Sequence, residues 1–509
     1  MKASGLDPAR KSDSEASDRQ ASCADSDWGT GVSRCAALTV FFVAYAFLIA
    51  FHPSLTLRDP DTFWHIRTGQ WILENGRWPE SDVFSHTFAG QPWIAKEWLS
   101  QLVLALAYQL GGWQVVAALT SVVYAAIAAT LTVYLSQIIR FSVAIGLTAI
   151  TLILISPHFL ARPHLLGFAI LSVWIISLLN ALDSERPPSI GLAVWMLLWA
   201  NIHSTFVLGL MIFYILAGFL CVRLFRKGEI AGVKRTLVVA ALVTAATVGT
   251  PYGISSLLVT RSIMGMSSIM ANLQEWQPPN FRAYPAVLAY LVGFIMLATG
   301  AGVKLCLPRL AVLGIMTWLG FSYMRGFFLL LLILPLIMAR PTARQVAFLS
   351  AQLPDRAGDP VLLFVGRYAS VIPVFFCGLA IAATLFSWRL QNVEPPEIIA
   401  PSAAINYVKG ANIGGAVFNS YGFGGYMIFS GIPTFVDGRA ELYGDEFLRK
   451  YFAAINLTDP VAAFRLLDDY KIGLAILQPN APLAKALNAS MTWRNVHSDQ
   501  SAVVFLRRP

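Results

Sequence analysis

No residue from Trp98 to Ile139 carries a charge, and this stretch restricts the possible folds more than any other feature of the chain. A membrane-spanning helix needs about 20 mostly apolar residues, so the stretch is longer than one bilayer crossing requires. Similar apolar runs recur along the sequence, and 13% of its 509 residues are charged, compared with about 25% in a typical soluble protein. These features predict a polytopic α-helical membrane protein.

We predict about eleven transmembrane helices from the apolar runs. They cover residues 35–53, 113–136, 141–157, 164–181, 189–202, 205–224, 236–250, 284–300, 309–323, 326–340 and 369–388.

The first part of the uncharged stretch, WLSQLVLALAYQL, stops at Gly111-Gly112 and is short for a bilayer crossing. We therefore predict one span at 113–136, preceded by a helix that lies at the membrane interface. A second span here would place the basic segment RLFRKGEIAGVKR outside, against the positive-inside rule. The N-terminus is then cytoplasmic, and the C-terminal region lies outside.

Three regions follow from this topology. Residues 1–34 are polar and are predicted to be a disordered cytoplasmic tail. Residues 35–389 form the transmembrane domain, with a large first outer loop at 54–112. Residues 390–509 regain charge and are predicted to form a small extracytoplasmic α/β domain. Its expected strands are GAVFNS, GYMIFS, PTFVDGR, LAILQP and SAVVFLRR, and its expected helices are EFLRKYFAAI and DPVAAFRLLDDY.

The net charge of +9 does not indicate a nucleic-acid partner, because the basic residues fall between apolar runs, as they do in cytoplasmic loops. Membrane lipids are the partners that this pattern predicts. The five cysteines are scattered and predict neither a disulfide framework nor a metal site.

An acidic pair follows the first span in the segment RDPDTFWHIRTGQW, which runs from Arg58 to Trp71. Residues 62–74 have the spacing of a short helix lying along the membrane, with Asp59 and Asp61 at its N-terminal end. A carboxylate there could deprotonate an incoming hydroxyl, so both are catalytic candidates. The pair could also bind a divalent metal, Mg²⁺ or Mn²⁺. The alternative is two acids in a solvated loop.

Further polar residues converge on the same predicted outer side, where each also has a structural interpretation. Glu97 is a third catalytic candidate, or forms a surface ion pair with Lys96. Arg162 and Arg325 either bind phosphate or extend to the interface. The remaining candidates for substrate binding are His65, His86, His164, Asn201, His203, Glu275, Asp437 and Arg439.

Four of these candidates have a specific alternative role. Asn201 and His203 alternatively cap a helix end. Asp437 and Arg439 alternatively pair with each other and hold a turn within the C-terminal domain.

This arrangement resembles the GT-C superfamily of membrane glycosyltransferases, whose first outer loop begins with an acidic pair. Asp59-Pro60-Asp61 stands at the place of that motif. The motif D-x-D-x-x-W-H, together with GGY and DGR, is similar to a group of bacterial proteins near the protein mannosyltransferase and aminoarabinose transferase branches. The later predicted outer loops contain no second D-x-D, and the C-terminal domain contains no W-W-D triplet, which argues against protein N-glycosylation.

The resemblance implies an inverting glycosyltransferase in the bacterial inner membrane. It would move a sugar from a polyprenyl-phosphate-linked donor to a glycan, lipid or protein acceptor of the cell envelope, on the outer face. Asp59 would be the general base. The alternatives are a transporter or flippase for lipid-linked glycans and a non-catalytic envelope-assembly protein. Transporters tend to carry ionisable residues near mid-membrane, where the predicted spans have almost none.

Overall fold

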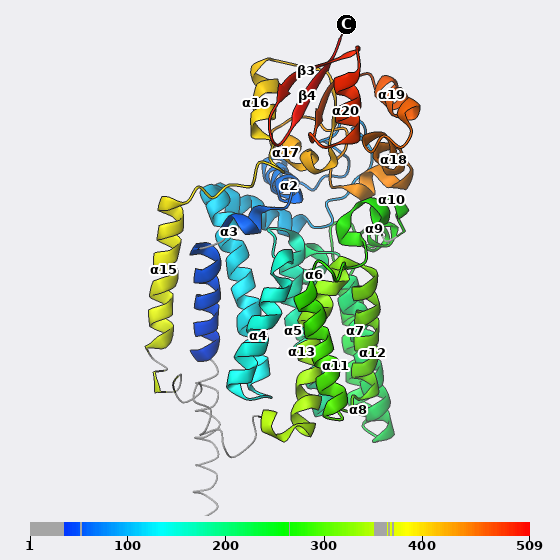
Figure 1. The fold of residues 1–509 in the computed structure, drawn as a ribbon. Helices are drawn as coiled ribbons and strands as arrows, with labels where there is room; N and C mark the ends of the chain where they lie inside the picture. The colour runs from blue at the N-terminus through cyan, green and yellow to red at the C-terminus, as the bar shows by residue number, and fades with distance from the viewer. Residues whose placement is uncertain are drawn as a thin grey trace, which may run out of the picture.

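The computed structural model describes residues 35–50, 53–263, 265–350, 364, 367–368 and 371–508. The predicted disordered tail at 1–34 lies outside this described part of the chain. Figure 1 shows a bundle of long helices with a small mixed domain at one end.

Each of the eleven apolar runs is helical over most of the residues that the structure describes. The helices are Cys35–Ala50, α3 (Trp98–Ser136), α4 (Phe141–Ile155), α5 (Pro163–Ser184), α6 (Gly191–Ile202), α7 (Phe206–Arg226), α8 (Ile230–Ala246), α11 (Pro285–Gly300), α12 (Leu307–Ser322), α13 (Met324–Gln345) and α15 (Ile372–Leu390). Within the described residues, six helices are long and apolar enough to cross a membrane. A polytopic α-helical membrane protein is therefore confirmed, whereas the number of crossings remains a prediction.

The helix α3 bends at Gly111 and Gly112, where the sequence predicted that an interfacial helix ends. Gly112 has a φ of 63°, a left-handed conformation that glycine adopts without a steric penalty. The part before the bend packs on α2 (Asp61–Asn75). Gly69 allows this close approach, because a Cβ there would overlap the carbonyl group of Gln101.

The core of the bundle is α13, most of whose residues are buried. At the end of the bundle away from the mixed domain, Asp183 pairs with Arg309 at 2.5 Å and with Arg340 at 3.3 Å. These ion pairs join α5, α12 and α13. Burying a charge is costly unless it is paired, so these contacts favour the packing in which the three helices meet.

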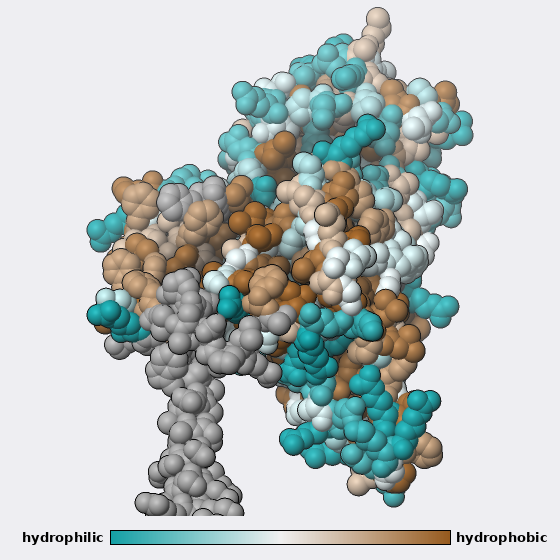
Figure 2. Space-filling model, turned by 60° about the horizontal axis from the view of Figure 1, so that its bottom comes forward, coloured by the Kyte–Doolittle hydropathy of each residue, from teal (hydrophilic) through white to brown (hydrophobic). Residues whose placement is uncertain are grey.

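The acidic loop and the C-terminal domain lie at the same end of the bundle (Figure 1). The same end carries η1 (Pro53–Leu57), α9 (Ser255–Ile263), α10 (Ser267–Asn272) and the short turns η2 (Ser156–His158) and η3 (Gln274–Trp276). Figure 2 shows hydrophilic residues at the two ends and mainly apolar residues between them. An apolar band between polar ends is what a bilayer requires.

The C-terminal domain is built on a four-stranded sheet in the order β1-β2-β4-β3. The β1–β2 pair is parallel, and the other two pairs are antiparallel. Its strands are β1 (Ala416–Asn419), β2 (Ile472–Leu477), β3 (Trp493–Ser498) and β4 (Val503–Arg507), and its helices and turn are α16 (Ser402–Gly410), η6 (Tyr421–Phe423), α17 (Gly424–Phe429), α18 (Ala440–Ile455), α19 (Pro460–Asp469) and α20 (Pro482–Ala489). The predicted small α/β fold is therefore confirmed.

Two of the five expected strands are wrong. GYMIFS belongs to helix α17, and PTFVDGR forms a turn with a single bridge from Thr434 to Ser85. Both segments are apolar because they are buried against other parts of the protein, so their composition misled the prediction. The strand β3 was not predicted, because its residues Arg494, Asn495 and Ser498 are polar and exposed.

Candidate functional site

One guanidinium group gathers three carboxylates at the end of the bundle that carries the C-terminal domain. Arg162 directly precedes α5, and its terminal nitrogens lie 3.0 Å from Asp59 Oδ2, 2.5 Å from Asp61 Oδ2 and 3.2 Å from Glu275 Oε2. The four residues come from three regions of the sequence. The structure therefore brings together four of the polar residues that the sequence placed on one side.

The local fold fixes the acidic pair. Pro60 precedes the first residue of α2, and the Asp61 backbone N–H donates to Asp59 Oδ1 at 2.8 Å. Thr62 Oγ1 donates to the Ala161 carbonyl at 3.0 Å, which ties the start of α2 to the residue before Arg162. Asp59 is 5% exposed, so it is not an acid in a solvated loop.

A second arginine completes this cluster. Arg325 lies 2.8 Å from Glu275 Oε1, and its guanidinium stacks over the Trp276 ring at 5.1 Å. Glu275 therefore bridges the two arginines. Arg162, Arg325, Asp59, Asp61 and Glu275 are called the arginine–carboxylate cluster below. With every group ionised, its two cations and three anions leave one negative charge in excess.

The excess negative charge affects the pKa of Asp59. Burial raises the pKa of Asp59 to about 7; Arg162 opposes the shift, and the neighbouring charges of Asp61 and Glu275 add to it. Burial also disfavours the charge on Glu275, but Arg325 and Arg162 outweigh it and hold the pKa of Glu275 down to about 2. The Asp59 carboxyl can therefore exchange a proton near neutral pH.

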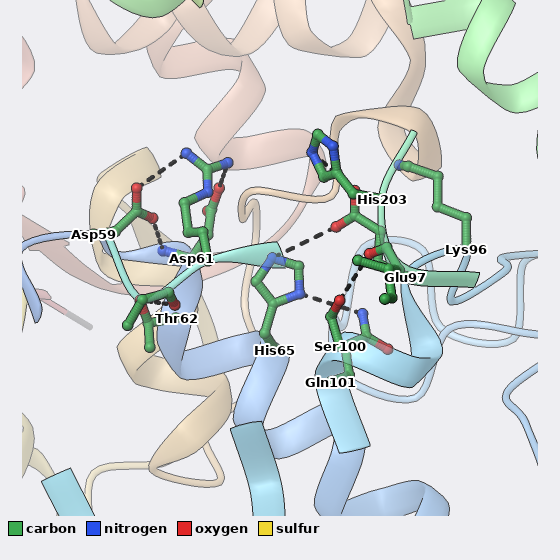
Figure 3. Close-up of polar contacts among 12 residues, drawn as sticks. Asp59, Asp61, Thr62, His65, Lys96, Glu97, Ser100, Gln101 and His203 are labelled. Carbon is green, nitrogen blue, oxygen red and sulfur yellow. Dashed lines mark hydrogen bonds and ion pairs between the residues drawn. The ribbon is translucent and has the colours of Figure 1, made fainter. Parts of the chain in front are cut away.

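A fourth carboxylate lies beside the cluster between two imidazoles (Figure 3). Glu97 is 3.8 Å from His65 Nε2 and 3.5 Å from His203 Nε2. Burial, with help from Arg162 and Lys96, lowers the pKa of both histidines well below the usual range, so both rings are neutral. Burial also raises the pKa of Glu97. Because Asp61 and His65 are four residues apart on α2, this group adjoins the acidic pair.

The structure changes the partner expected for Glu97. Lys96 pairs with Glu441 of the C-terminal domain at 2.7 Å, so the alternative of a surface ion pair between Lys96 and Glu97 is wrong. Lys96 and Glu97 lie in the turn that precedes α3, and the sequence did not identify the distant Glu441 as a partner of Lys96.

Asn201 and His164 lie in the walls around these groups. The side chain of Asn201 accepts from Trp98 Nε1 at 2.7 Å and donates to the Leu197 and Gly249 carbonyls, which agrees with its structural interpretation. The His164 ring lies 6.2 Å from that of His203, and its Nε2 contacts the His158 carbonyl at 2.8 Å. Within the described part of the chain, neither side chain contacts the arginine–carboxylate cluster.

Asp437 and Arg439 are completely buried in the C-terminal domain. Arg439 lies 2.7 Å from Asp437 Oδ2 and 2.5 Å from Asp82 Oδ1, and none of the three side chains is exposed. This arrangement agrees with local pairing and leaves no surface for the predicted substrate contact. The sequence did not identify Asp82, although its place in SDVFSHT marks a turn: its carboxylate accepts from the backbone N–H groups of Phe84 and Ser85.

The remaining candidate, His86, contacts the C-terminal domain. Its Nε2 lies 2.9 Å from the Val417 carbonyl, and its ring lines a cavity of about 580 Å³ between α16, β1 and residues 431–433. None of the other predicted site residues lines this cavity. His86 is therefore set apart from the arginine–carboxylate cluster.

The acidic pair does not have the surroundings of a metal site. Among the described residues, no group of three or more His, Cys, Asp or Glu residues could hold a metal ion. Asp59 and Asp61 instead direct an oxygen each at Arg162, whose positive charge occupies the place a cation would take. The predicted Mg²⁺ or Mn²⁺ site does not fit these residues.

No protein-family model and no curated protein matches the chain. Solved structures do match its fold. The apo oligosaccharyltransferase of Archaeoglobus fulgidus is similar over 88% of this chain and 69% of its own, at a TM-score of 0.50 and 10% identity. ArnT of Cupriavidus metallidurans in the apo state aligns over 92% of this chain and 97% of its own, at a TM-score of 0.46 and 15% identity. The first likeness shows a shared fold, and the expected GT-C-like fold is confirmed.

Proposed function

We propose that this chain, which has the fold of the GT-C membrane glycosyltransferases, moves a sugar from a polyprenyl-phosphate-linked donor to an acceptor of the cell envelope. The acceptor would be a glycan, lipid or protein on the outer face of the membrane. The observation that carries the proposal is the arginine–carboxylate cluster, which places a carboxylate that titrates near neutral pH beside two arginines at the end of a membrane bundle.

In the proposed reaction, Asp59 takes the proton of the acceptor hydroxyl as its oxygen attacks the anomeric carbon. The bond from that carbon to the phosphate oxygen breaks, and its electron pair stays on the phosphate. Attack from the face opposite the phosphate inverts the anomeric centre. Arg325 is 28% exposed in its side chain and is the more accessible arginine for the phosphate. Arg162 holds Asp59 and Asp61 in place.

Glu97, His65 and His203 supply a place for the sugar in this proposal. The carboxylate accepts hydrogen bonds from sugar hydroxyl groups, and the neutral imidazoles can donate or accept hydrogen bonds. Both Glu97–His distances exceed a hydrogen bond, so these groups do not saturate each other. A sugar hydroxyl that bonds Glu97 would therefore replace no strong contact.

The reaction should depend on pH through Asp59. A general base works only when deprotonated, and burial raises the pKa of Asp59 to about 7. At saturating donor, the rate should therefore rise about tenfold per pH unit below that pKa and level off above it. Measurement of kcat against pH in nanodiscs tests this. A rate that is constant between about pH 5.5 and 7.5 would remove Asp59 as the base.

Envelope glycans test the proposal against its rivals. Cells that lack the protein should miss one sugar in a mass-spectrometric comparison, and the wild-type gene should restore it while an Asp59→Ala variant at equal protein level does not. Restoration by both would remove Asp59 from the mechanism. Substrate-dependent flux in liposomes without a covalent product would favour a transporter. An unchanged envelope would favour a non-catalytic assembly protein.

A further inference from the structure

Three glycines of the C-terminal domain mark where its backbone meets other chain segments most closely. They are Gly424, Gly425 and Gly438, from the motifs GGY and DGR. None of them has a positive φ, so the backbone conformation does not require glycine at these positions. A Cβ at any of the three would nevertheless overlap a neighbouring atom. Glycine is therefore required at these three positions because a side chain would not fit.

Two of these glycines face the acidic motif of the first outer loop. A Cβ at Gly425 would overlap the carbonyl oxygen of Pro60. A Cβ at Gly438 would overlap Asp61 Oδ1 and would lie 2.9 Å from Trp64 Nε1. The sequence motifs D-x-D-x-x-W-H, GGY and DGR, which are far apart in the chain, thus meet in one interface.

The two oxygens of the Asp61 carboxylate have different neighbours. Oδ2 pairs with Arg162 at 2.5 Å, while Oδ1 faces the backbone of Gly438. A carboxylate held between a cation on one side and a packed backbone on the other has little freedom to rotate. The contact with Gly438 therefore bears directly on the direction of the Asp61 charge.

The turn that carries Gly438 is rigid. On one side, Asp437 accepts from Thr434 Oγ1 at 3.0 Å and from Tyr443 Oη at 2.5 Å. On the other side, Arg439 pairs with Asp437 and Asp82, with no exposed surface. Because Asp82 belongs to the first outer loop, the same turn is anchored to the membrane domain. Gly438 thus has little room to yield to Asp61.

We infer that Gly438 is a positioning residue for Asp61, and that the C-terminal domain forms one wall of the reaction site. The inference rests on the proposed function for its catalytic part and on the contact itself for its structural part. In this inference the completely buried Asp437–Arg439–Asp82 group acts indirectly. It fixes the turn that carries Gly438, and Gly438 in turn restricts Asp61.

A double-mutant cycle tests the contact without any substrate. Gly438→Ala should lower the Tm of the purified protein by about 2–6 °C, because the added methyl group displaces Asp61. In an Asp61→Ala background only the 2.9 Å approach to Trp64 Nε1 remains, so Gly438→Ala should lower the Tm much less than it does in the wild type. Gly473→Ala is the matched control, since a Cβ there would meet nothing within 4 Å. Equal Tm losses in both backgrounds would overturn the contact.

Transfer kinetics test the positioning. Gly438→Ala should lower kcat about 10²-fold, the cost of displacing a reacting group by about 1 Å, and should change the KM for the donor much less. Gly473→Ala should keep the wild-type rate. In the Asp61→Ala background, Gly438→Ala should not lower the residual rate further.

These measurements separate the two hypotheses. A wild-type protein that makes no covalent product would overturn the proposed function, while the Tm cycle would still decide the contact. A wild type that transfers sugar, an inactive Asp61→Ala variant and a Gly438→Ala variant with wild-type kcat would overturn the positioning role alone. Should Gly438→Ala fail to accumulate, recovery of the Gly438→Ala/Asp61→Ala protein would support the contact, and failure of both would contradict it.

Discussion

Replacing Asp59 by asparagine should lower sugar transfer about 10²- to 10⁴-fold, the contribution of a general base. Asparagine keeps the size of the side chain and removes its basicity. It also removes the surplus negative charge of the arginine–carboxylate cluster, whose burial raises the pKa of Asp59. The variant should therefore accumulate to the level of the wild type and should have at least the same Tm. The lost activity would then not reflect lost protein.

An acid on the same helix provides the control. Glu74 is an exposed residue in the last turn of α2 and pairs with Arg67, so Glu74→Gln should transfer sugar at the wild-type rate. The comparison is made at equal protein level in membranes, with product measured by mass spectrometry. An Asp59→Asn variant with more than about a tenth of the wild-type rate would contradict the assignment of the base.

Replacing Arg439 by methionine should lower the free energy of unfolding by about 3–5 kcal/mol, the cost of breaking a fully buried ion pair. Arg439 is completely buried, and its loss leaves Asp437 and Asp82 without their cation. Two parts of the protein are affected, since Asp82 lies between α2 and α3, outside the C-terminal domain. The C-terminal domain should therefore become sensitive to protease in the intact membrane protein.

An exposed ion pair in the same domain gives the reference value. Lys450 and Glu446 are 2.8 Å apart on α18, with side chains 59% and 73% exposed. Lys450→Met should cost about 0–1 kcal/mol. Thermal unfolding and limited proteolysis of both variants in nanodiscs provide the comparison. Similar losses for Arg439→Met and Lys450→Met would show that the buried group does not hold the domain in place.

The sequence was sufficient for the helices and for the side of the molecule that carries the site. Charge-free runs have few alternatives to membrane helices, and glycines at 111 and 112 marked the bend in α3. Asp59, Asp61, Arg162, Glu275 and Arg325 all fell in predicted outer segments, and the structure brings them into contact.

The ion pairs around the site could not be predicted from the sequence because they join distant segments. The contact of Arg439 with Asp82 spans 357 residues, and that of Lys96 with Glu441 spans 345. The segment GYMIFS was expected to be a strand, yet Gly424 and Gly425 pack as a helix against neighbouring backbone. Local propensity does not report such packing, so tertiary contacts decided the outcome.

The most direct measurement uses purified protein in nanodiscs. It is mixed with the lipid fraction of cells that lack the protein, which should retain unused donor, and with the envelope fraction of the same cells as acceptor. The account predicts a covalent mass increase of one sugar on the acceptor with the wild type and none with Asp59→Asn. No mass increase with the wild type, or an equal increase with the wild type and Asp59→Asn, would contradict the claim that this carboxylate drives a glycosyl transfer.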